Sequence, residues 1–162
     1  MRLKFLLVLA TGILVTSLQA QDYRIENGEV KIVKEILFKT ASAELLPESD
    51  AALLIIKKYL DDKSYISLLR VETHTDNAGD AAQLLTEQRS LAVCKKLVAL
   101  GVDCNRILPV GFGNTKPVAD NSTPEGKAQN QRTCFFNAAL RGKNIGGLPA
   151  DGGGKAAGDP CN

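Results

Sequence analysis

The sequence predicts an α+β protein, an α/β two-layer sandwich in which the helices are available to cover one face of a sheet. Three observations predict this class. Segments with alternating or β-branched apolar residues are separated by segments whose apolar residues recur with the helical period. Both kinds of segment have ordinary lengths, and the length of the chain suits one domain. The expected order is strand, helix, strand, helix, strand, short helix, strand.

The first four elements follow from their periodicity. Residues 30–38 (VKIVKEILF) mix alternation with β-branched residues and predict a strand. Pro47 suits a first helical turn, and a helix is expected from there through about Leu60. Residues 66–73 (ISLLRVET) predict a second strand, apolar enough for the centre of a sheet. Residues 79–100 return to the helical period and predict the second helix.

The later elements are shorter. Residues 106–110 contain Pro109, which cannot donate a ladder hydrogen bond, so an edge strand is expected. Residues 123–130 open with a capping residue and a proline, which predicts a short helix. Residues 133–140 (TCFFNAAL) predict the last strand. Beyond Arg141 the chain is Gly-rich with little to bury, and we expect a flexible tail.

The first residues are typical of a secretory signal peptide, with a basic start, an apolar core and Ala20 at the expected cleavage site. The chain is therefore expected to divide into a signal peptide (1–20), a short N-terminal segment (21–29), the folded domain (30–141) and the tail (142–162). The apolar run of the signal peptide is too short to span a bilayer comfortably, and nothing later is more hydrophobic. We expect an exported protein with no transmembrane segment of its own.

The charge of the exported chain is balanced. Removing the two basic residues of the signal peptide leaves 18 Lys and Arg against 18 Asp and Glu. A nucleic-acid partner normally requires a basic patch, and the sequence has neither a basic block nor interleaved aromatic residues. The composition therefore argues against nucleic-acid binding.

The four cysteines are Cys94, Cys104, Cys134 and Cys161, and export to an oxidising compartment favours disulfides. Three pairings are open. Cys94 and Cys104 can close over a short loop, which would leave Cys134 to hold the tail through Cys161, so we favour that pairing. A metal site is disfavoured, because no CxxC motif is present and the single histidine is 20 residues from the nearest cysteine. We expect no cofactor and no metal.

Three short motifs occur in a fixed order along the chain. Residues 73–76 (THTD) close an apolar run, a helix-like LTEQRS segment carries Arg89, and residues 130–132 (NQR) precede the last strand. From residue 36 to residue 132 the chain resembles the OmpA-like (OmpA/MotB) peptidoglycan-binding domain, whose hallmarks are a GHTD loop, an LSxxRA helix and a late NRR. The resemblance implies a mixed four-stranded sheet with the helices on one face. It also implies a protein of the periplasm, or one peripheral to the outer membrane.

The resemblance also implies a binding site. In the family, the Asp of the TD pair and the Arg of the following helix hold the diaminopimelate of the peptidoglycan stem peptide. Asp76 would accept hydrogen bonds from the ligand ammonium, and Arg89 would grip its carboxylate with two parallel donors. Arg132 and Asn130 would support the structure. The further residues expected at the ligand flank the two charged ones: His74, Thr75, Asn77, Leu85 and Thr86.

The sequence departs from the family pattern at several positions. Thr73 replaces a Gly, Ala82 an Asn and Gln131 an Arg, and Asp76 and Arg89 stand 13 residues apart, closer than in the family. These departures motivate an alternative in which the fold is kept as an envelope protein-interaction module with weakened or lost peptidoglycan binding. In either case an outer-membrane or other envelope protein is expected to supply an anchor.

Two further alternatives concern the same motif. An Asp just before a helix commonly caps the backbone N–H groups of that helix, so Asp76 could be a cap. His74 is the only histidine and invites a catalytic hypothesis, but catalysis needs a nucleophile, a base and an orienting acid in one cluster. No GxSxG or equivalent surrounds any serine, Ser90 included. We therefore expect a protein that is not an enzyme.

Overall fold

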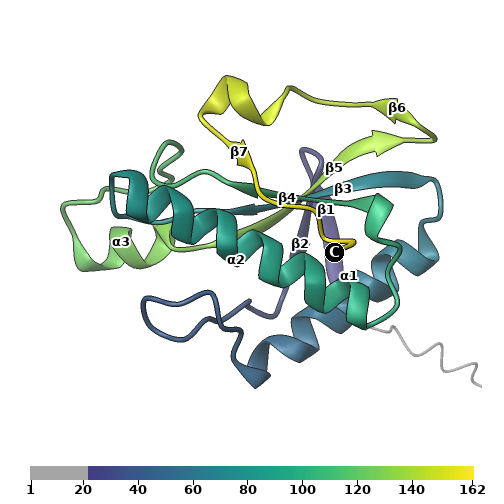
Figure 1. Cartoon of the computed structure of the whole chain (residues 1–162), viewed down its shortest axis with the longest axis horizontal. Helices are drawn as coiled ribbons and strands as arrows, with labels where there is room; N and C mark the ends of the chain where they lie inside the picture. Colours follow the sequence, from purple (N-terminus) through teal and green to yellow (C-terminus); the bar gives the residue numbers. More distant parts are fainter. Residues whose placement is uncertain (1–21) are drawn as a thin grey trace, which may run out of the picture.

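A mixed sheet of seven strands runs through the computed structural model, which describes residues 22–162 (Figure 1). The predicted signal peptide lies outside the described residues. The strands are β1 (Tyr23–Glu26), β2 (Glu29–Ile32), β3 (Ile66–Thr73), β4 (Ile107–Gly111), β5 (Thr133–Leu140), β6 (Lys143–Asn144) and β7 (Lys155–Ala156). The order across the sheet is β1-β2-β5-β3-β4-β7, and β6 pairs with β5. The predicted α+β class and mixed sheet are confirmed, but the sheet has seven strands where four were expected, because β1, β6 and β7 join it as well.

The centre of the sheet is β3, which is parallel to β4 and antiparallel to β5. Both β3 and β5 have the bounds that their sequence patterns predict. Alternate side chains of a strand point to opposite faces, and Leu69 and Val71 are completely buried on the helix side. The next residue on that face, Thr73, donates a hydrogen bond to the backbone oxygen of Thr86. This contact ties the end of β3 to the helix above it.

Three helices accompany the sheet: α1 (Asp50–Asp62), α2 (Asp80–Ala99) and α3 (Pro124–Asn130). Short 3-10 turns lie at Pro47–Ser49, Cys104–Arg106 and Pro149–Gly152. In the view of Figure 1, α1 and α2 lie below the sheet, and most of the C-terminal segment, in yellow, lies above it. Within residues 22–162, no helix has the length and apolar character needed to cross a membrane.

The helix ends are formed by local sequence signals. After α2, Gly101 adopts φ 98°, and the Val102 N–H reaches back to the Leu97 carbonyl oxygen at 3.0 Å, which satisfies a carbonyl that the helix leaves unpaired. Before α3, the Thr123 hydroxyl accepts a hydrogen bond from the Gly126 N–H at 3.0 Å. These two signals explain why α2 and α3 end and begin where their sequences predict.

The N-terminal region differs from the predicted single strand over residues 30–38. The strand β2 ends at Ile32, and β1 pairs with it as a hairpin across Asn27-Gly28, both with positive φ. Asn-Gly is a strong hairpin signal, because both turn positions need positive φ. After Ile32 the chain leaves the sheet, and Phe38 forms only an isolated bridge with Leu45. The resulting loop is held at Leu37, whose N–H and C=O both bond to the Ser49 hydroxyl, at 2.8 and 2.9 Å.

The C-terminal segment also differs from the flexible tail that its composition predicts. It forms β6 and then β7, and β7 pairs with the outer side of β4. The edge strand predicted from Pro109 is therefore covered: the Pro109 carbonyl accepts the Ala157 N–H at 3.0 Å. The glycines permit close packing, since a Cβ on Gly154 would lie 2.6 Å from the Phe112 ring. Glycine at that position lets the backbone lie directly on an aromatic ring.

The predicted disulfide pairing is wrong. Cys104 and Cys161 are bonded, with their Cα atoms 5.2 Å apart, whereas Cys94 and Cys134 are free and buried. The tail passes β4 and ends beside the turn that follows α2, which brings Cys161 to Cys104. Cys94 lies within α2, and its side chain packs in the hydrophobic core. Burial raises the pKa of the Cys94 thiol and raises the pKa of the Cys134 thiol to about 12.

Candidate functional site

The THTD motif continues the ladder of β3 beyond its last residue. The His74 N–H donates to the Arg132 carbonyl at 2.9 Å, and the Thr75 N–H donates to the Gly113 carbonyl at 2.9 Å. The two neighbouring strands therefore hold this segment from both sides. Thr75 is buried, whereas Asp76 is the first partly exposed residue of the motif. The end of β3 thus delivers the Asp76 carboxylate to the surface in a defined position.

Asp76 is held by a neutral partner. Its Oδ1 accepts a hydrogen bond from Gln131 Nε2 at 2.7 Å and a longer one from the Thr75 hydroxyl at 3.3 Å. The residue that precedes α2 is Gly79, and no side chain caps that helix. Asp76 is therefore not a helix cap, and its negative charge is oriented by an amide without being neutralised by it.

Arg89 is half-buried on α2 and fixed by two contacts. Its guanidinium lies over the Phe38 ring, 4.8 Å from the centroid, and its Nε donates to the Ser42 carbonyl at 2.8 Å. Burial lowers the pKa of Arg89 from its ordinary value, yet an Arg side chain stays charged. Among the described residues, the two terminal nitrogens of Arg89 have no hydrogen-bond partner. They are free to donate to a ligand.

A cavity of about 150 Å³ lies beside Arg89. Asp76 is not among the lining residues, but Gln131 is, and the Gln131 side chain donates a hydrogen bond to the Asp76 carboxylate. No ion pair within residues 22–162 joins Asp76 to Arg89. We call this space the Arg89 cavity, and its lining residues are Ile36, Leu37, Phe38, Thr73, His74, Arg89, Gln131, Arg132 and Thr133.

Of the other residues expected at the ligand, His74 lines the Arg89 cavity, whereas Thr75, Asn77, Leu85 and Thr86 do not. Thr86 is completely buried, and its hydroxyl donates to the Gln83 carbonyl at 2.8 Å and accepts the Gly113 N–H at 2.9 Å. It therefore ties α2 to the loop after β4 and cannot reach a ligand. Asn77 is exposed and Leu85 half-buried, and neither lines the cavity.

The departures from the family pattern have local replacements. Thr73, in the place of a Gly, uses its hydroxyl to bond the backbone of α2. Next to Ala82, Gln83 supplies an amide whose Nε2 donates to the Gly111 carbonyl and to the Glu87 carboxylate, each at 2.9 Å. The helix is thereby fastened to β4 at the base of the site. The first turn of α2 is therefore anchored without the Asn that the family pattern contains.

Asn130 and Arg132 join α3 to β5. The Asn130 side chain accepts the Val118 and Ala119 N–H groups at 2.7 and 3.1 Å and donates to the Ala119 carbonyl at 2.8 Å. Arg132 donates to the Lys116 carbonyl at 3.0 Å. The loop after β4 is therefore fastened to the start of β5, beside the Arg89 cavity.

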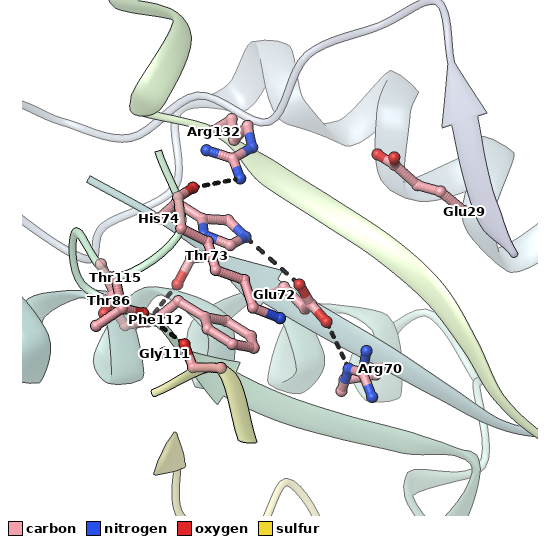
Figure 2. Close-up of polar contacts among 12 residues, drawn as sticks. Glu29, Arg70, Glu72, Thr73, His74, Thr86, Gly111, Phe112, Thr115 and Arg132 are labelled. Atoms are coloured by element: carbon pink, nitrogen blue, oxygen red, sulfur yellow. Dashed lines mark hydrogen bonds and ion pairs between the residues drawn. The ribbon is translucent and has the colours of Figure 1, made fainter. Parts of the chain in front are cut away.

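His74 is buried behind the THTD turn. Its ring stacks on Phe112, with centroids 5.0 Å apart, and its Nε2 lies 3.5 Å from Glu72 Oε2, longer than an ordinary hydrogen bond (Figure 2). Burial lowers the pKa of His74, and the nearby charges of Arg132 and Lys116 lower it further, whereas Glu72 opposes them. For Glu72, burial alone would raise the pKa, but contacts with His74 and Arg70 outweigh it and the pKa is lowered.

Sequence reasoning missed three groups that shape the site. Phe38 and the Ser42 carbonyl orient Arg89, and Gln131 orients Asp76. Phe38 was expected to lie in a strand, and Gln131 was considered only as a residue that replaces the Arg of the family pattern. The Ser42 contact is a backbone carbonyl, which no residue pattern identifies. Arg89 meets Phe38 and Ser42 only because the loop before α1 packs against α2 in the folded protein.

The OmpA family model matches residues 37–131, more than half of the chain, and the chain therefore belongs to the OmpA family. The chain is 34% identical to the outer-membrane lipoprotein YfiB of Pseudomonas aeruginosa over 78% of this chain and 76% of YfiB. It is 34% identical to the probable lipoprotein YiaD of Escherichia coli over 66% of this chain, but it spans only 49% of YiaD.

Shorter matches and solved structures give the same family. The peptidoglycan-binding protein ArfA of Mycobacterium tuberculosis is 42% identical over 38% of this chain and 20% of ArfA. The crystal structure of the peptidoglycan-associated lipoprotein of Burkholderia pseudomallei superposes with a TM-score of 0.56 at 26% identity, over 64% of this chain and 88% of that one. The names of these relatives describe binding or structural proteins of the envelope and none describes an enzyme.

Proposed function

We propose that this protein is a non-catalytic cell-envelope protein that binds peptidoglycan through the diaminopimelate of the stem peptide and helps tether or organise the cell wall. The observation that carries the proposal is a pair of opposite charges: Arg89 lines the Arg89 cavity, and Asp76 is bonded to Gln131 of the same lining. Asp76 and Arg89 are each oriented by a neutral group, and neither is neutralised by the other. The family to which the chain belongs includes proteins named for peptidoglycan binding or association.

The chemistry of the site matches a zwitterionic end group. The free end of diaminopimelate carries an ammonium and a carboxylate. The two terminal nitrogens of Arg89 offer a fork that suits a carboxylate, and Asp76 offers an acceptor for the ammonium. The stacking on Phe38 and the bond to the Ser42 carbonyl orient the fork before the ligand arrives, which reduces the entropy lost on binding.

The size of the cavity limits what it can hold. Pockets for whole drug-sized ligands have volumes of roughly 300 to 1,000 Å³, whereas the Arg89 cavity has about 150 Å³. It therefore suits the end group of one side chain and not a complete stem peptide. The remainder of the peptide would lie outside the cavity, over the loop that contains Ile36 and Leu37.

The interaction-module alternative also has an observation in its favour. One atom of each charged group already has an internal partner, since Asp76 Oδ1 bonds Gln131 and Arg89 Nε bonds the Ser42 carbonyl. Both partners are neutral, and each leaves at least one further atom of the group available. We therefore favour wall binding, for which an outer-membrane or other envelope protein would supply the anchor.

Co-sedimentation of the protein with purified peptidoglycan tests the proposal. Asp76→Ala and Arg89→Ala should each weaken binding about tenfold to 150-fold, because a hydrogen bond to a charged group contributes about 1.5 to 3 kcal/mol. Arg24→Ala and Asp151→Ala remove exposed charges that do not line the cavity, and they should bind as the wild type does. Equal retention of all five proteins would refute wall binding at this site.

The choice of stem peptide tests the diaminopimelate detail separately. A stem peptide with lysine in place of diaminopimelate has the ammonium but not the second carboxylate. The wild type should therefore bind the lysine peptide more weakly, and Arg89→Ala should bind the two peptides almost equally. If the wild type binds both equally while Arg89→Ala is still impaired, the site recognises another part of the wall.

A further inference from the structure

The face of the sheet away from α1 and α2 carries charged side chains in buried positions. The strand registers place Glu29, Phe136 and Arg70 in one row across β2, β5 and β3, and Cys134 beside Glu72 in the next row. Partners in a register have side chains on the same face. Figure 2 shows Glu72 between Arg70 and His74, with Arg132 beyond His74. Glu72 and His74 are each only 3% exposed.

These side chains border a cavity of about 380 Å³, which we call the Lys116 cavity. Arg89 lines only the Arg89 cavity and Lys116 lines only this one, whereas His74 and Arg132 border both cavities. Its lining residues are Glu29, Lys31, Arg70, Glu72, His74, Lys116, Val118, Arg132, Cys134 and Phe136.

The charges of the Lys116 cavity do not cancel. Lys31 is paired with Glu29, and Arg70 is paired with Glu72, each at 2.5 Å. Two cations of the lining then remain without a carboxylate partner among the described residues. One is Lys116, whose Nζ lies 4.2 Å from the centroid of the Phe112 ring, and the other is Arg132, which donates only to backbone carbonyls. The cavity has an excess of two positive charges.

His74 gives a second, independent indication of a ligand. Its side chain is 2% exposed, its Nε2 lies 3.5 Å from Glu72 Oε2, and its Nδ1 has no hydrogen-bond partner within the described part of the chain. Buried polar atoms without partners are rare and costly, and each one calls for a specific explanation. The stacking of the ring on Phe112 holds the imidazole in place at the wall of the cavity. The Nδ1 atom is therefore available to a partner that the described part of the chain does not supply.

We propose that the Lys116 cavity is a second binding site, which takes a small oxyanion, a carboxylate or a phosphate, between Lys116 and Arg132 with His74 beside it. Two cations with free donors suit an anion that carries one or two negative charges. Among residues 22–162 no group of His, Cys, Asp and Glu side chains could hold a metal ion, so the chemistry of the lining favours an anion.

Anion binding at this site is coupled to the protonation of His74. Lys116 and Arg132 disfavour the imidazolium, and a bound anion offsets both of them. Binding should therefore be tighter at pH 5.5 than at pH 7.5. The charged and titratable groups around the ring are those of the lining: Arg70 and Glu72 on β3, Arg132 just before β5, Cys134 on β5, Glu29 and Lys31 on β2, and Lys116 after β4.

The single histidine of the chain makes the test direct. The ring resonances of His74 are followed by ¹⁵N NMR while phosphate or acetate replaces chloride at constant ionic strength. We expect a saturable change in these resonances, weakened about tenfold in Lys116→Gln, because one charge-assisted hydrogen bond is lost. Lys127→Gln, an exposed lysine outside the cavity, is the matched control and should bind as the wild type does.

A second variant protects the test against misfolding. Val118 is 61% exposed at the cavity, so Val118→Glu should leave the fold intact and place a carboxylate beside the two cations. It should abolish the response to added anions. A response to phosphate alone, to acetate alone or to both identifies the oxyanion. The proposal would be overturned if added chloride changed the His74 resonances as phosphate or acetate does. It would also be overturned if Lys116→Gln and Val118→Glu bound the anion as tightly as the wild type. If Lys116→Gln still binds peptidoglycan, then loss of the anion site does not affect wall binding at the Arg89 cavity.

Discussion

Replacing Thr86 with valine should destabilise the protein and leave its ligand binding intact. Thr86 is completely buried, and its hydroxyl accepts the Gly113 N–H at 2.9 Å. Valine has nearly the same shape but no hydroxyl. The change therefore removes one acceptor from a closed interface between α2 and the loop after β4, without opening a cavity. The motif pattern alone predicts the opposite behaviour, a stable protein with a damaged binding site.

The magnitude follows from the hydrogen bonds that are lost. The Gly113 N–H would stay buried without a partner, which costs about 1 to 3 kcal/mol. The second bond, from the Thr86 hydroxyl to the Gln83 carbonyl, matters less, since a helix carbonyl keeps its backbone donor. We expect a loss of about 2 kcal/mol in the free energy of unfolding. For a domain of this size that corresponds to a fall in Tm of about 4 to 8 °C.

Urea denaturation and peptidoglycan co-sedimentation measure the two outcomes side by side. Thr86→Val should lower the midpoint of unfolding with an unchanged slope, and the folded variant should bind like the wild type. Thr86→Ser is the matched control, because it keeps the hydroxyl and loses one methyl group, at a cost of about 1 kcal/mol. A Thr86→Val protein that is as stable as the wild type, or that is fully folded and no longer binds, would refute the assignment of Thr86 to the interior.

Three further predictions concern the tail and the buried histidine. Replacing Cys104 and Cys161 with serine opens a loop of 57 residues. The chain entropy of that loop predicts a loss of up to about 4 kcal/mol in the free energy of unfolding. Denaturation without reductant measures the loss, and an unchanged stability would contradict the disulfide. Gly154→Ala should detach the tail, because the new methyl group would lie 2.6 Å from the Phe112 ring. Detachment would be measured as faster amide hydrogen exchange in β7 and β4. Unchanged exchange would contradict the contact between Gly154 and the Phe112 ring. The pKa of His74 is lowered in the folded protein, so the unfolded protein binds more protons below about pH 6.5. The free energy of unfolding should therefore fall as the pH is lowered from 7 through 6.5, by at most about 1.4 kcal/mol per pH unit. In His74→Gln this dependence on pH should be weaker.

The sequence patterns located most of the framework because they are local. The alternation of apolar residues in β3 and β5 and the Gly101 signal after α2 need only neighbouring residues. The pattern over residues 30–38 failed for the opposite reason. Its first residues pair with β1 and the later ones follow a loop, and periodicity does not indicate where the neighbouring strand ends.

The candidate site was predictable in position but not in detail. The motif order indicated Asp76 and Arg89; Arg89 lines a small cavity, and Asp76 is bonded to Gln131 of its lining. The partners of these two residues were not predictable, since Gln131 is 55 residues from Asp76 and Ser42 is 47 residues from Arg89. Thr86 was assigned to the ligand from its place in the motif, although its side chain points into the interior. A motif indicates which residues occur together, but not which way each side chain points.

By itself the sequence determined the family, the central strands, the helices and the two charged residues of the candidate site. Periodicity and end signals are properties of neighbouring residues, and the order of motifs follows from the sequence alone, so none of them requires the packing of the chain. Only the tertiary structure decided the Cys104–Cys161 bond, the folding of the Gly-rich tail onto β4 and the positively charged cavity beside His74. Each of these joins residues that are far apart along the chain, and their proximity depends on the packing of the whole domain.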